Sequence, residues 1–376
     1  MGTVAKGVYE VIAFFVGTTA ELIKIAPVHR ALVELDARPE LWFTAWHVDG
    51  IAETLADLDL PEPDVWLVPP DRARHVDRSG RVPRWAAEVA RTVRRDRREL
   101  RRRLTADGRP PLVAVHGDTF STPYGSVIAR TVLGARVAHV EAGMRSGSLT
   151  SPFPEELNRR IASRLTDLHF APTRREVDNL AGVRGVVVET GANTVVDALR
   201  EALAGGGAPT DLPPRFGLAT LHRFELVSRE NRFREVLELL RAAADRLPIV
   251  YLAGPLERER IERAGLTDLF DGTRFLMRDK MRYRRFLPVL ARAEFVVTDS
   301  GGLQEECAYL GVPAAIHRER TERHQGLGRN IVLTGMRTDV IAKFLDDYES
   351  LRAPSLVDQY HPTKKIVDTL TRFGFC

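Results

Sequence analysis

The chain of 376 residues is long enough for two domains, and its 44% hydrophobic and 28% charged residues are ordinary for a globular protein. Its net charge of +4 is weak evidence for a nucleic-acid partner, because the densest arginine cluster, residues 91–103, alternates with acids and apolar residues as an amphipathic helix does. The two cysteines, Cys307 and Cys376, cannot form a disulfide framework. The apolar run near the N-terminus is too short to cross a bilayer. We therefore expect a cytoplasmic protein without membrane or nucleic-acid partners.

In the first half of the chain, apolar segments with the length of strands alternate with helical segments. This alternation predicts βαβ units and a parallel sheet. The expected strands are residues 9–17, 41–48, 64–70, 112–117, 136–142, 168–173 and 186–191, and the clearest helices are 20–35, 84–104, 121–133, 155–165 and 192–203.

A glycine triplet that begins at Gly205 and three prolines close behind it mark a linker. After the linker the alternation resumes, and one more helix is expected at residues 361–373. The expected strands are 217–221, 249–254, 273–277, 295–299, 313–317 and 330–334, and the expected helices are 231–246, 255–265, 282–293, 302–310 and 337–351.

Seven strands, a linker, six strands and a tail helix predict an α/β protein with two Rossmann-like, doubly wound domains that face one another across a cleft. The N-terminal domain would span residues 1–204 and the C-terminal domain residues 205–355. The remaining residues, 356–376, would form a helix that packs back on the first domain. A cleft between two such domains is a common ligand site.

Three acidic residues lie where an expected strand gives way to a loop or a helix. Asp118 follows the apolar run LVAV in VHGDT, Glu141 ends RVAHV in HVEAGMRSG, and Glu155 stands in SPFPEELNRR. Because open α/β sheets bind ligands at the carboxyl ends of their strands, these acids could share one site. Several carboxylates together suit proton transfer at a neutral sugar carbon. Taken singly, each could equally be a surface acid, a cap or a turn residue.

A second motif, FVVTDSGGLQEE, places a Ser-Gly-Gly turn between an expected strand and a helix. Gly301 and Gly302 allow an anion to approach the backbone and the first N–H groups of the helix, and Ser300 can add its hydroxyl. This pattern predicts a diphosphate cradle, with Glu306 one turn further on as an acceptor for ribose hydroxyls. The alternative is an ordinary strand–helix turn.

Two further segments carry candidate cations. His222 and Arg223 in LATLHRFE close the first strand after the linker, where they could stabilise a departing diphosphate. Lys24 in GTTAELIKIAP lies two turns into the first helix and could reach phosphate. A structural histidine and a solvated lysine are the alternatives.

Taken in order, these segments resemble the non-hydrolysing UDP-N-acetylglucosamine 2-epimerases. The resemblance covers most of the chain and is carried by GTTAELIKIAP, VHGDT, HVEAGMRSG, SPFPEELNRR, HRFE, TDSGGLQEE and RTERHQG. It implies the GT-B arrangement of two Rossmann-like domains and a homodimer, without a metal or a nicotinamide. It also implies a reaction in which loss of the C2 proton expels UDP, and UDP then returns to the 2-acetamidoglucal intermediate to give UDP-N-acetylmannosamine.

The resemblance also assigns roles to individual positions. It implies that Asp118, Glu141 and Glu155 are the catalytic carboxylates and that His222 assists the departure of UDP. Lys24 would lie near the nucleotide, and Arg145 and Arg223 would bind substrate. Ser300 and Gly301, with Gly302, would form the phosphate cradle, and Glu306 would bind ribose. Which acid removes the C2 proton and which returns one stays open.

Two positions depart from the family pattern. The family usually reads Gly-Thr-Arg-Pro-Glu at the first turn, where this chain has Thr19 in place of the arginine, and only His47 remains of the Gln-His pair at the exit of the second strand. Without the arginine we expect nucleotide binding to depend more on Lys24, Arg223 and the helix terminus, and an altered sugar nucleotide is an alternative. The loss of the glutamine predicts weak or absent activation by a second substrate molecule. A hydrolysing epimerase, a GT-B glycosyltransferase and a non-catalytic sugar-nucleotide sensor are the alternatives, and the pathway stays open.

Overall fold

The computed structural model describes residues 11–74, 76, 79–105, 111–146, 154–205, 211–222 and 230–376. Its contacts divide the chain into two compact units. Unit 1 comprises Met1–Ala198 together with Tyr360–Cys376, and unit 2 comprises Leu199–Gln359. The last helix, α14 (Pro362–Arg372), therefore belongs to unit 1, where it packs against α1 (Thr19–Glu34).

Unit 1 is built on a parallel sheet of seven strands in the order β3-β2-β1-β4-β5-β6-β7. The order reverses between β1 and β4, which is the switch point of a doubly wound sheet. The central strands β1, β4 and β5 are buried, apart from the exposed Arg136 at the start of β5, and rich in Val, Ala and Phe, as expected of strands covered on both faces. The strands are β1 (Val11–Val16), β2 (Arg38–Phe43), β3 (Val65–Trp66), β4 (Leu112–His116), β5 (Arg136–Val140), β6 (Leu168–Ala171) and β7 (Val186–Glu189).

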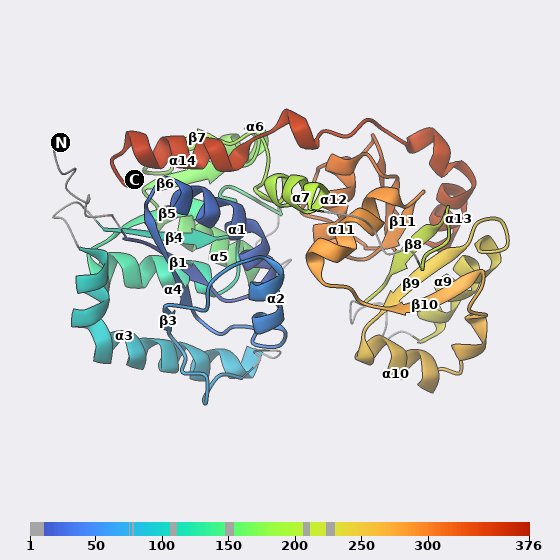
Figure 1. The fold of residues 1–376 in the computed structure, drawn as a ribbon, viewed down its shortest axis with the longest axis horizontal. Coiled ribbons are helices and arrows are strands. Elements are labelled where there is room, and N and C mark those ends of the chain that lie inside the picture. Colours follow the sequence, from blue (N-terminus) through green and yellow to red (C-terminus); the bar gives the residue numbers. More distant parts are fainter. Residues whose placement is uncertain are drawn as a thin grey trace, which may run out of the picture. The chain divides into compact units, whose positions relative to one another are not determined.

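The helices of unit 1 connect these strands and lie on both sides of the sheet (Figure 1). The loops that leave β4 and β5 lead into α4 and toward α5, and α4 packs against α5. The helices after α1 are α2 (Ile51–Asp57), α3 (Val82–Leu104), α4 (Ser121–Ile128), α5 (Glu155–Leu165), α6 (Arg174–Asn179) and α7 (Val195–Ala204), the last of which continues into unit 2.

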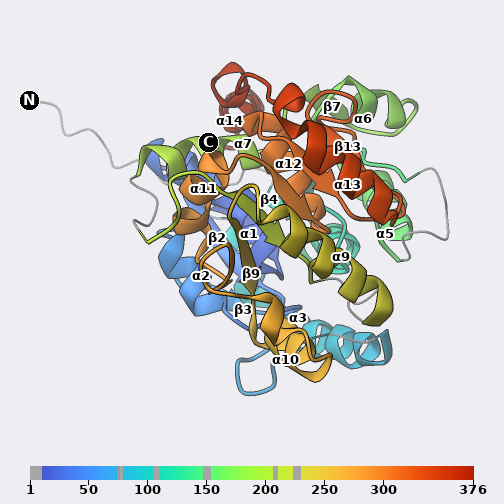
Figure 2. The same cartoon turned by 90° about the vertical axis from the view of Figure 1, so that its right-hand side faces the viewer.

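Unit 2 contains a second parallel sheet, of six strands in the order β10-β9-β8-β11-β12-β13. Helices α9 and α13 pack together (Figure 2). The core that they form with the sheet includes Phe233, Tyr251 and Phe344. The strands are β8 (Gly217–Thr220), β9 (Ile249–Ala253), β10 (Phe275–Asp279), β11 (Val296–Thr298), β12 (Ala314–Ile316) and β13 (Ile331–Leu333). The helices are α9 (Glu230–Ala243), α10 (Pro255–Arg263), α11 (Tyr283–Arg292), α12 (Gly301–Leu310) and α13 (Thr338–Asp347).

The predicted α/β class with two Rossmann-like sheets is confirmed, and the differences are local. The second strand begins at Arg38 and ends at Phe43, earlier than expected, because Ala45 adopts a left-handed backbone (φ +52) that extended chain does not have. Helix α2 was not expected, and the helix expected at 121–133 ends at Ile128 and continues as a π-helix over Ala129–Leu133.

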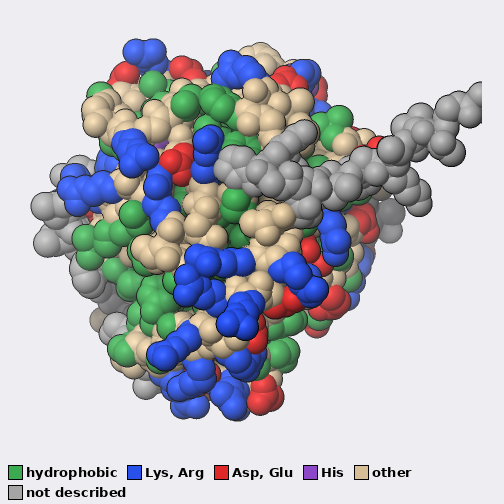
Figure 3. Space-filling view, turned by 90° about the vertical axis from the view of Figure 1, so that its left-hand side faces the viewer, with side chains coloured by type: hydrophobic (Ala, Val, Ile, Leu, Met, Phe, Trp, Pro, Cys, Tyr) green, Lys and Arg blue, Asp and Glu red, His purple; other side chains and the backbone are tan. Residues whose placement is uncertain are grey.

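The arginine cluster lies on α3, as expected. On the face shown in Figure 3, Lys and Arg side chains gather in the lower part, with Asp and Glu side chains beside them. Ion pairs such as Arg91 with Glu88 and Arg95 with Asp96 link neighbouring charges on this helix, which is the pattern of a solvated face. None of the helices in the described residues combines the length and the apolarity needed to span a bilayer.

Candidate functional site

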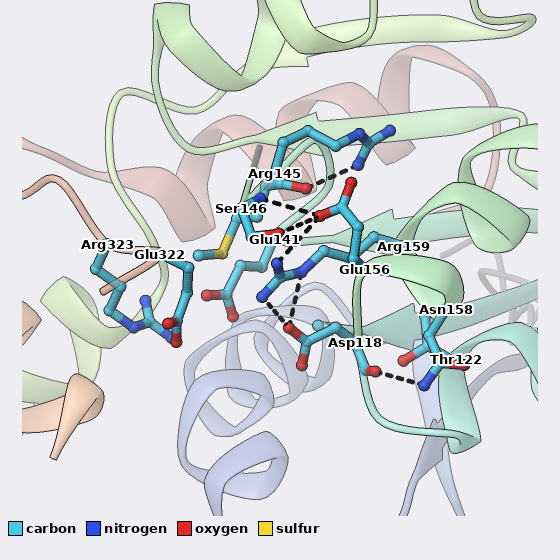
Figure 4. A network of polar contacts seen from close by, with 12 residues as sticks. Asp118, Thr122, Glu141, Arg145, Ser146, Glu156, Asn158, Arg159, Glu322 and Arg323 are labelled. Carbon is cyan, nitrogen blue, oxygen red and sulfur yellow. Dashed lines mark hydrogen bonds and ion pairs between the residues drawn. The ribbon is translucent and has the colours of Figure 1, made fainter. Parts of the chain in front are cut away.

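Asp118 lies in the turn that follows β4 and is held by α5. The Nε atom of Arg159 donates to its Oδ2 at 2.9 Å, and Nη2 of the same guanidinium donates to that oxygen as well (Figure 4). The side-chain amide of Asn158 donates to the backbone carbonyl of Asp118 at 2.9 Å. Arg159 is 3% exposed, so this charge-assisted contact fixes the direction of the Asp118 carboxylate.

Glu156, one residue after the predicted Glu155, is the buried centre of the same network. Its carboxylate accepts from the backbone N–H of Ser146 at 3.0 Å and from Nε of Arg160 at 2.9 Å (Figure 4). Burial alone would raise the pKa of Glu156, but the contacts from Ser146, Arg160 and Arg145 lower it below its ordinary value overall. Glu155 itself begins α5, one turn from Arg159.

Glu141 follows β5 directly and contacts Lys24 and His116. The ammonium of Lys24, on α1, lies 2.6 Å from Oε2 of Glu141, and Nε2 of His116, at the end of β4, lies 3.2 Å from the same oxygen. All three side chains are buried. Glu141 also has a left-handed backbone (φ +65), which is costly for a residue other than glycine and is typical of functional positions.

The first turn is held by Glu21, which the sequence analysis did not assign to the site. Its Oε2 accepts from the backbone N–H groups of Gly17 at 2.6 Å and Thr18 at 3.0 Å, and its Oε1 accepts from the hydroxyl of Thr119 at 2.7 Å. Thr18 caps α1 in return, which completes a capping box. Because Thr119 follows Asp118, Glu21 ties the start of α1 to the loop of the candidate catalytic aspartate.

In unit 2, His222 follows β8 and pairs with Asp299, which follows β11. The backbone N–H of His222 donates to Oδ2 of Asp299 at 2.9 Å, and Nδ1 lies 3.1 Å from Oδ1. Asp299 is 1% exposed, whereas the histidine side chain is 38% exposed. A buried carboxylate at Nδ1 favours the tautomer that carries its proton there and orients the ring.

The Ser-Gly-Gly turn forms the start of α12. Ser300 is the N-cap, with its side-chain oxygen accepting from the backbone N–H of Leu303 at 3.4 Å, and Gly301 is the first helical residue. A Cβ atom on Gly301 would lie 3.3 Å from Nη1 of Arg318 and 3.6 Å from Nε of Arg323. Oε1 of Glu322, which pairs with Arg318, also lies 3.6 Å from this position. The N-terminus of α12 therefore adjoins two guanidinium groups and one carboxylate, and its N–H groups suit a diphosphate.

The RTERHQG segment is anchored on α12. The side-chain amide of Gln304 donates to the backbone carbonyl of Arg323 at 3.0 Å, its oxygen accepts from Thr321 at 2.7 Å, and Glu305 forms an ion pair with Arg323. Glu306, the predicted ribose ligand, lies 6% exposed on the same helix. Burial and the Glu306 carboxylate raise the pKa of Tyr283 well above its ordinary value, so this phenol stays protonated.

The predicted site residues thus fall into two groups. Asp118, Glu141 and Glu155 lie at the ends of β4 and β5 and at the start of α5, with Lys24 and Arg145 in the same unit. His222, Ser300, Gly301, Gly302 and Glu306 lie in unit 2 at the ends of β8 and β11 and on α12. Arg223 lies outside the described residues. The roles assigned to all of them stay predictions.

Sequence reasoning missed the partners that hold these residues. Arg159 and Arg323 stand inside motifs that had been singled out, SPFPEELNRR and RTERHQG, but nothing in the motif indicated which side chain each arginine would meet. His116 and Asp299 are next to or near predicted site residues in the sequence. Their apolar surroundings were the available signal, because buried charged or polar side chains need partners.

Residues 98–366 match the sequence model of the UDP-N-acetylglucosamine 2-epimerase family. The chain is also 32% identical to the UDP-N-acetylglucosamine 2-epimerase of Bacillus subtilis over 326 residues, which cover 83% of this chain and 79% of the relative. The chain belongs to the UDP-N-acetylglucosamine 2-epimerase family. The family assignment makes the protein an isomerase.

Solved structures of family members share the fold. The UDP-GlcNAc 2-epimerase of Neisseria meningitidis, bound to UDP-GlcNAc, superposes with a TM-score of 0.75 at 25% identity and covers 96% of this chain and 100% of its own. The enzyme of Methanocaldococcus jannaschii, in complex with UDP-GlcNAc and UDP, gives a TM-score of 0.73 at 25% identity over 96% of this chain and 99% of its own. The two-sheet architecture of this chain is therefore that of the epimerase family.

Proposed function

We propose that the protein is a non-hydrolysing UDP-N-acetylglucosamine 2-epimerase, which interconverts UDP-N-acetylglucosamine and UDP-N-acetylmannosamine. The observation that carries the proposal is the pair of carboxylates at adjacent strand ends that each contact a buried cation, Asp118 with Arg159 and Glu141 with Lys24. Carboxylates held in their ionised form can accept a proton from a sugar carbon.

The proposed reaction starts with transfer of the C2 proton to a carboxylate of unit 1. The C–H electron pair forms the C1–C2 double bond, and the C1–O bond breaks with its electrons going to the departing UDP. The α12 N-terminus, with Ser300 and Gly301, would bind the diphosphate, and His222, oriented by Asp299, would stabilise its charge. UDP then re-adds to C1 while a second acid delivers a proton to the opposite face of C2.

The non-hydrolysing assignment rests on the first turn. Glu21, Leu22, Ile23 and Lys24 follow the non-hydrolysing pattern, whereas hydrolysing relatives usually carry Gly-Thr-Arg-Ala-Asp there. The length of the glutamate matters in this fold, because Glu21 spans from the Gly17 amide to the hydroxyl of Thr119. We also propose a homodimer, which sedimentation equilibrium would test.

Proton NMR of the purified protein with UDP-N-acetylglucosamine in deuterated water tests the proposal. We expect loss of the C2 proton signal together with growth of UDP-N-acetylmannosamine. Free N-acetylmannosamine with UDP would show the hydrolysing reaction instead. An unchanged spectrum from protein that still binds UDP would exclude this substrate and favour another sugar nucleotide or a glycosyltransferase.

The carboxylates are tested by isosteric amides. We expect Asp118→Asn, Glu141→Gln and Glu155→Gln each to lower turnover at least about a hundredfold, since a placed acid or base contributes ~10²–10⁴-fold. Near-normal turnover in all three variants would remove the proton-transfer roles from these residues, provided that each variant unfolds like the wild type.

A further inference from the structure

Lys24 meets a carboxylate in this structure, although the sequence indicated a residue near the nucleotide. Its ammonium lies 2.6 Å from Oε2 of Glu141, and the two side chains are 9% and 3% exposed. A buried ion pair at this distance is strongly coupled, and removing one partner leaves the other charge uncompensated away from water. The contact directs the lysine ammonium to the carboxylate at the end of β5.

The other titratable groups that face Glu141 do not replace the lysine charge. His116, on β4, places Nε2 3.2 Å from the same oxygen, but no hydrogen bond joins these two side chains. His139, on β5, has its pKa lowered to about 4 by burial, so it is neutral near pH 7. Lys24 is thus the residue of this set whose ammonium group contacts the carboxylate.

The backbone adds a second constraint on Glu141. Its φ of +65 is a conformation that the surroundings must hold. On one side of Glu141, the carbonyl of Val140 accepts from the backbone N–H of Gly117 at 3.0 Å, and on the other side the backbone N–H of Ala142 donates to the carbonyl of Phe170 at 3.0 Å. The side chain is then held from α1 and β4, so that both its direction and its charge are set before any substrate arrives.

We propose that Lys24 is a positioning residue for Glu141, which keeps this carboxylate ionised and aligned as an acceptor for the C2 proton, and that Lys24 is not a ligand of the diphosphate. The inference rests on the proposed function, because it assigns a role within the same reaction. In this proposal Lys24 acts through the Glu141 carboxylate, whereas the phosphate cradle at the start of α12 binds UDP directly.

The test compares Lys24→Met, which removes the charge at similar length, with Lys24→Arg, which keeps it. C2 proton exchange from UDP-N-acetylglucosamine is followed by NMR between pH 6 and pH 9, and UDP binding is measured by calorimetry. For Lys24→Met we expect exchange to fall roughly a hundredfold near pH 7, with the dissociation constant of UDP changed less than about twofold. The acid limb of kcat/KM should move to higher pH, because the ionised carboxylate has lost its cation, and Lys24→Arg should recover part of the exchange rate.

A Glu141→Gln background separates positioning from other roles. In that background Lys24→Met should cause no further loss of exchange, because residue 141 no longer carries a carboxylate. The double variant also lacks an unpaired buried charge, so it can be compared with Glu141→Gln if Lys24→Met alone folds poorly. A tenfold or larger rise in the UDP dissociation constant, or an additive loss in the double variant, would overturn the inference. Failure of the wild type to exchange the C2 proton would instead defeat the proposed function.

Discussion

Glu21 is a buried acid for which the structure predicts a measurable effect of pH on stability. Burial raises the pKa of its carboxyl from an ordinary value of 4.5 to about 7, although hydrogen bonds from Thr119, Gly17 and Thr18 act in the opposite direction. Because this pKa is higher in the folded than in the unfolded chain, the folded state binds the proton more tightly. The contribution of protonated Glu21 to the free energy of unfolding is fully present below about pH 4.5 and is lost as the pH rises through about 7.

The magnitude follows from the interval between the two values. One pH unit corresponds to ~1.4 kcal/mol, so ionisation of Glu21 costs the folded state roughly 3 kcal/mol well above pH 7, and about 2.5 kcal/mol of this develops between pH 5 and pH 8. Glu21→Gln cannot ionise, and its amide oxygen can still accept from the first turn. We therefore expect the variant to gain about 2.5 kcal/mol of unfolding free energy relative to the wild type over this range.

Urea denaturation followed by tryptophan fluorescence measures this difference in unit 1 alone, because all four tryptophans lie there: Trp42, Trp46, Trp66 and Trp85. Other titrating groups are common to both proteins and cancel in the comparison. Glu156→Gln is a matched control whose stability curve should run nearly parallel to that of the wild type from pH 5 to pH 8, because the pKa of Glu156 is lowered from 4.5 and its pH dependence lies at lower pH. Parallel stability curves for Glu21→Gln and wild type from pH 5 to pH 8 would refute the reasoning.

Three further results are expected. Asp299→Asn should lower kcat roughly tenfold or more while KM changes little, because His222 loses the charge that orients it, and an unchanged kcat would separate the pair from the reaction. Gly301→Val should weaken UDP binding at least about tenfold, because its side chain would fill the space beside Arg318 and Arg323, and near-normal binding would contradict a diphosphate site at the start of α12. Initial rates with UDP-N-acetylglucosamine should follow a hyperbola, and sigmoidal kinetics would contradict the expectation that a second substrate molecule does not activate the protein.

The strands of both sheets were predictable because they are short apolar runs between helical periods. The same periodicity placed the Ser-Gly-Gly turn after β11, because serine and glycine are typical of the start of a helix. The second strand was misplaced for a related reason. Pro39 and the buried Glu40 lie inside β2, and neither residue type is common in a covered strand.

The contacts that give the site its chemistry were not predictable from the sequence. Lys24 and Glu141 are 117 residues apart, and Arg159 and Asp118 are 41 residues apart. No local pattern connects such positions, because they become neighbours only through the order of the strands in the folded sheet. Glu21 was overlooked because an acid in the first turn of a helix is usually an exposed cap, whereas here it is 3% exposed.

The two carboxylates at the strand ends share one physical arrangement. Asp118 is held by Arg159 from α5 and Glu141 by Lys24 from α1, so each acid has a buried cation supplied by a different helix. The cost of desolvating and ordering these charges is met when the chain folds, and a substrate does not have to meet it again on binding. Loss of either cation should therefore impair proton transfer nearly as much as loss of the acid, while a change at the α12 cradle should act first on UDP affinity. The two groups of variants are thus distinguishable by separate measurements of proton exchange and nucleotide binding.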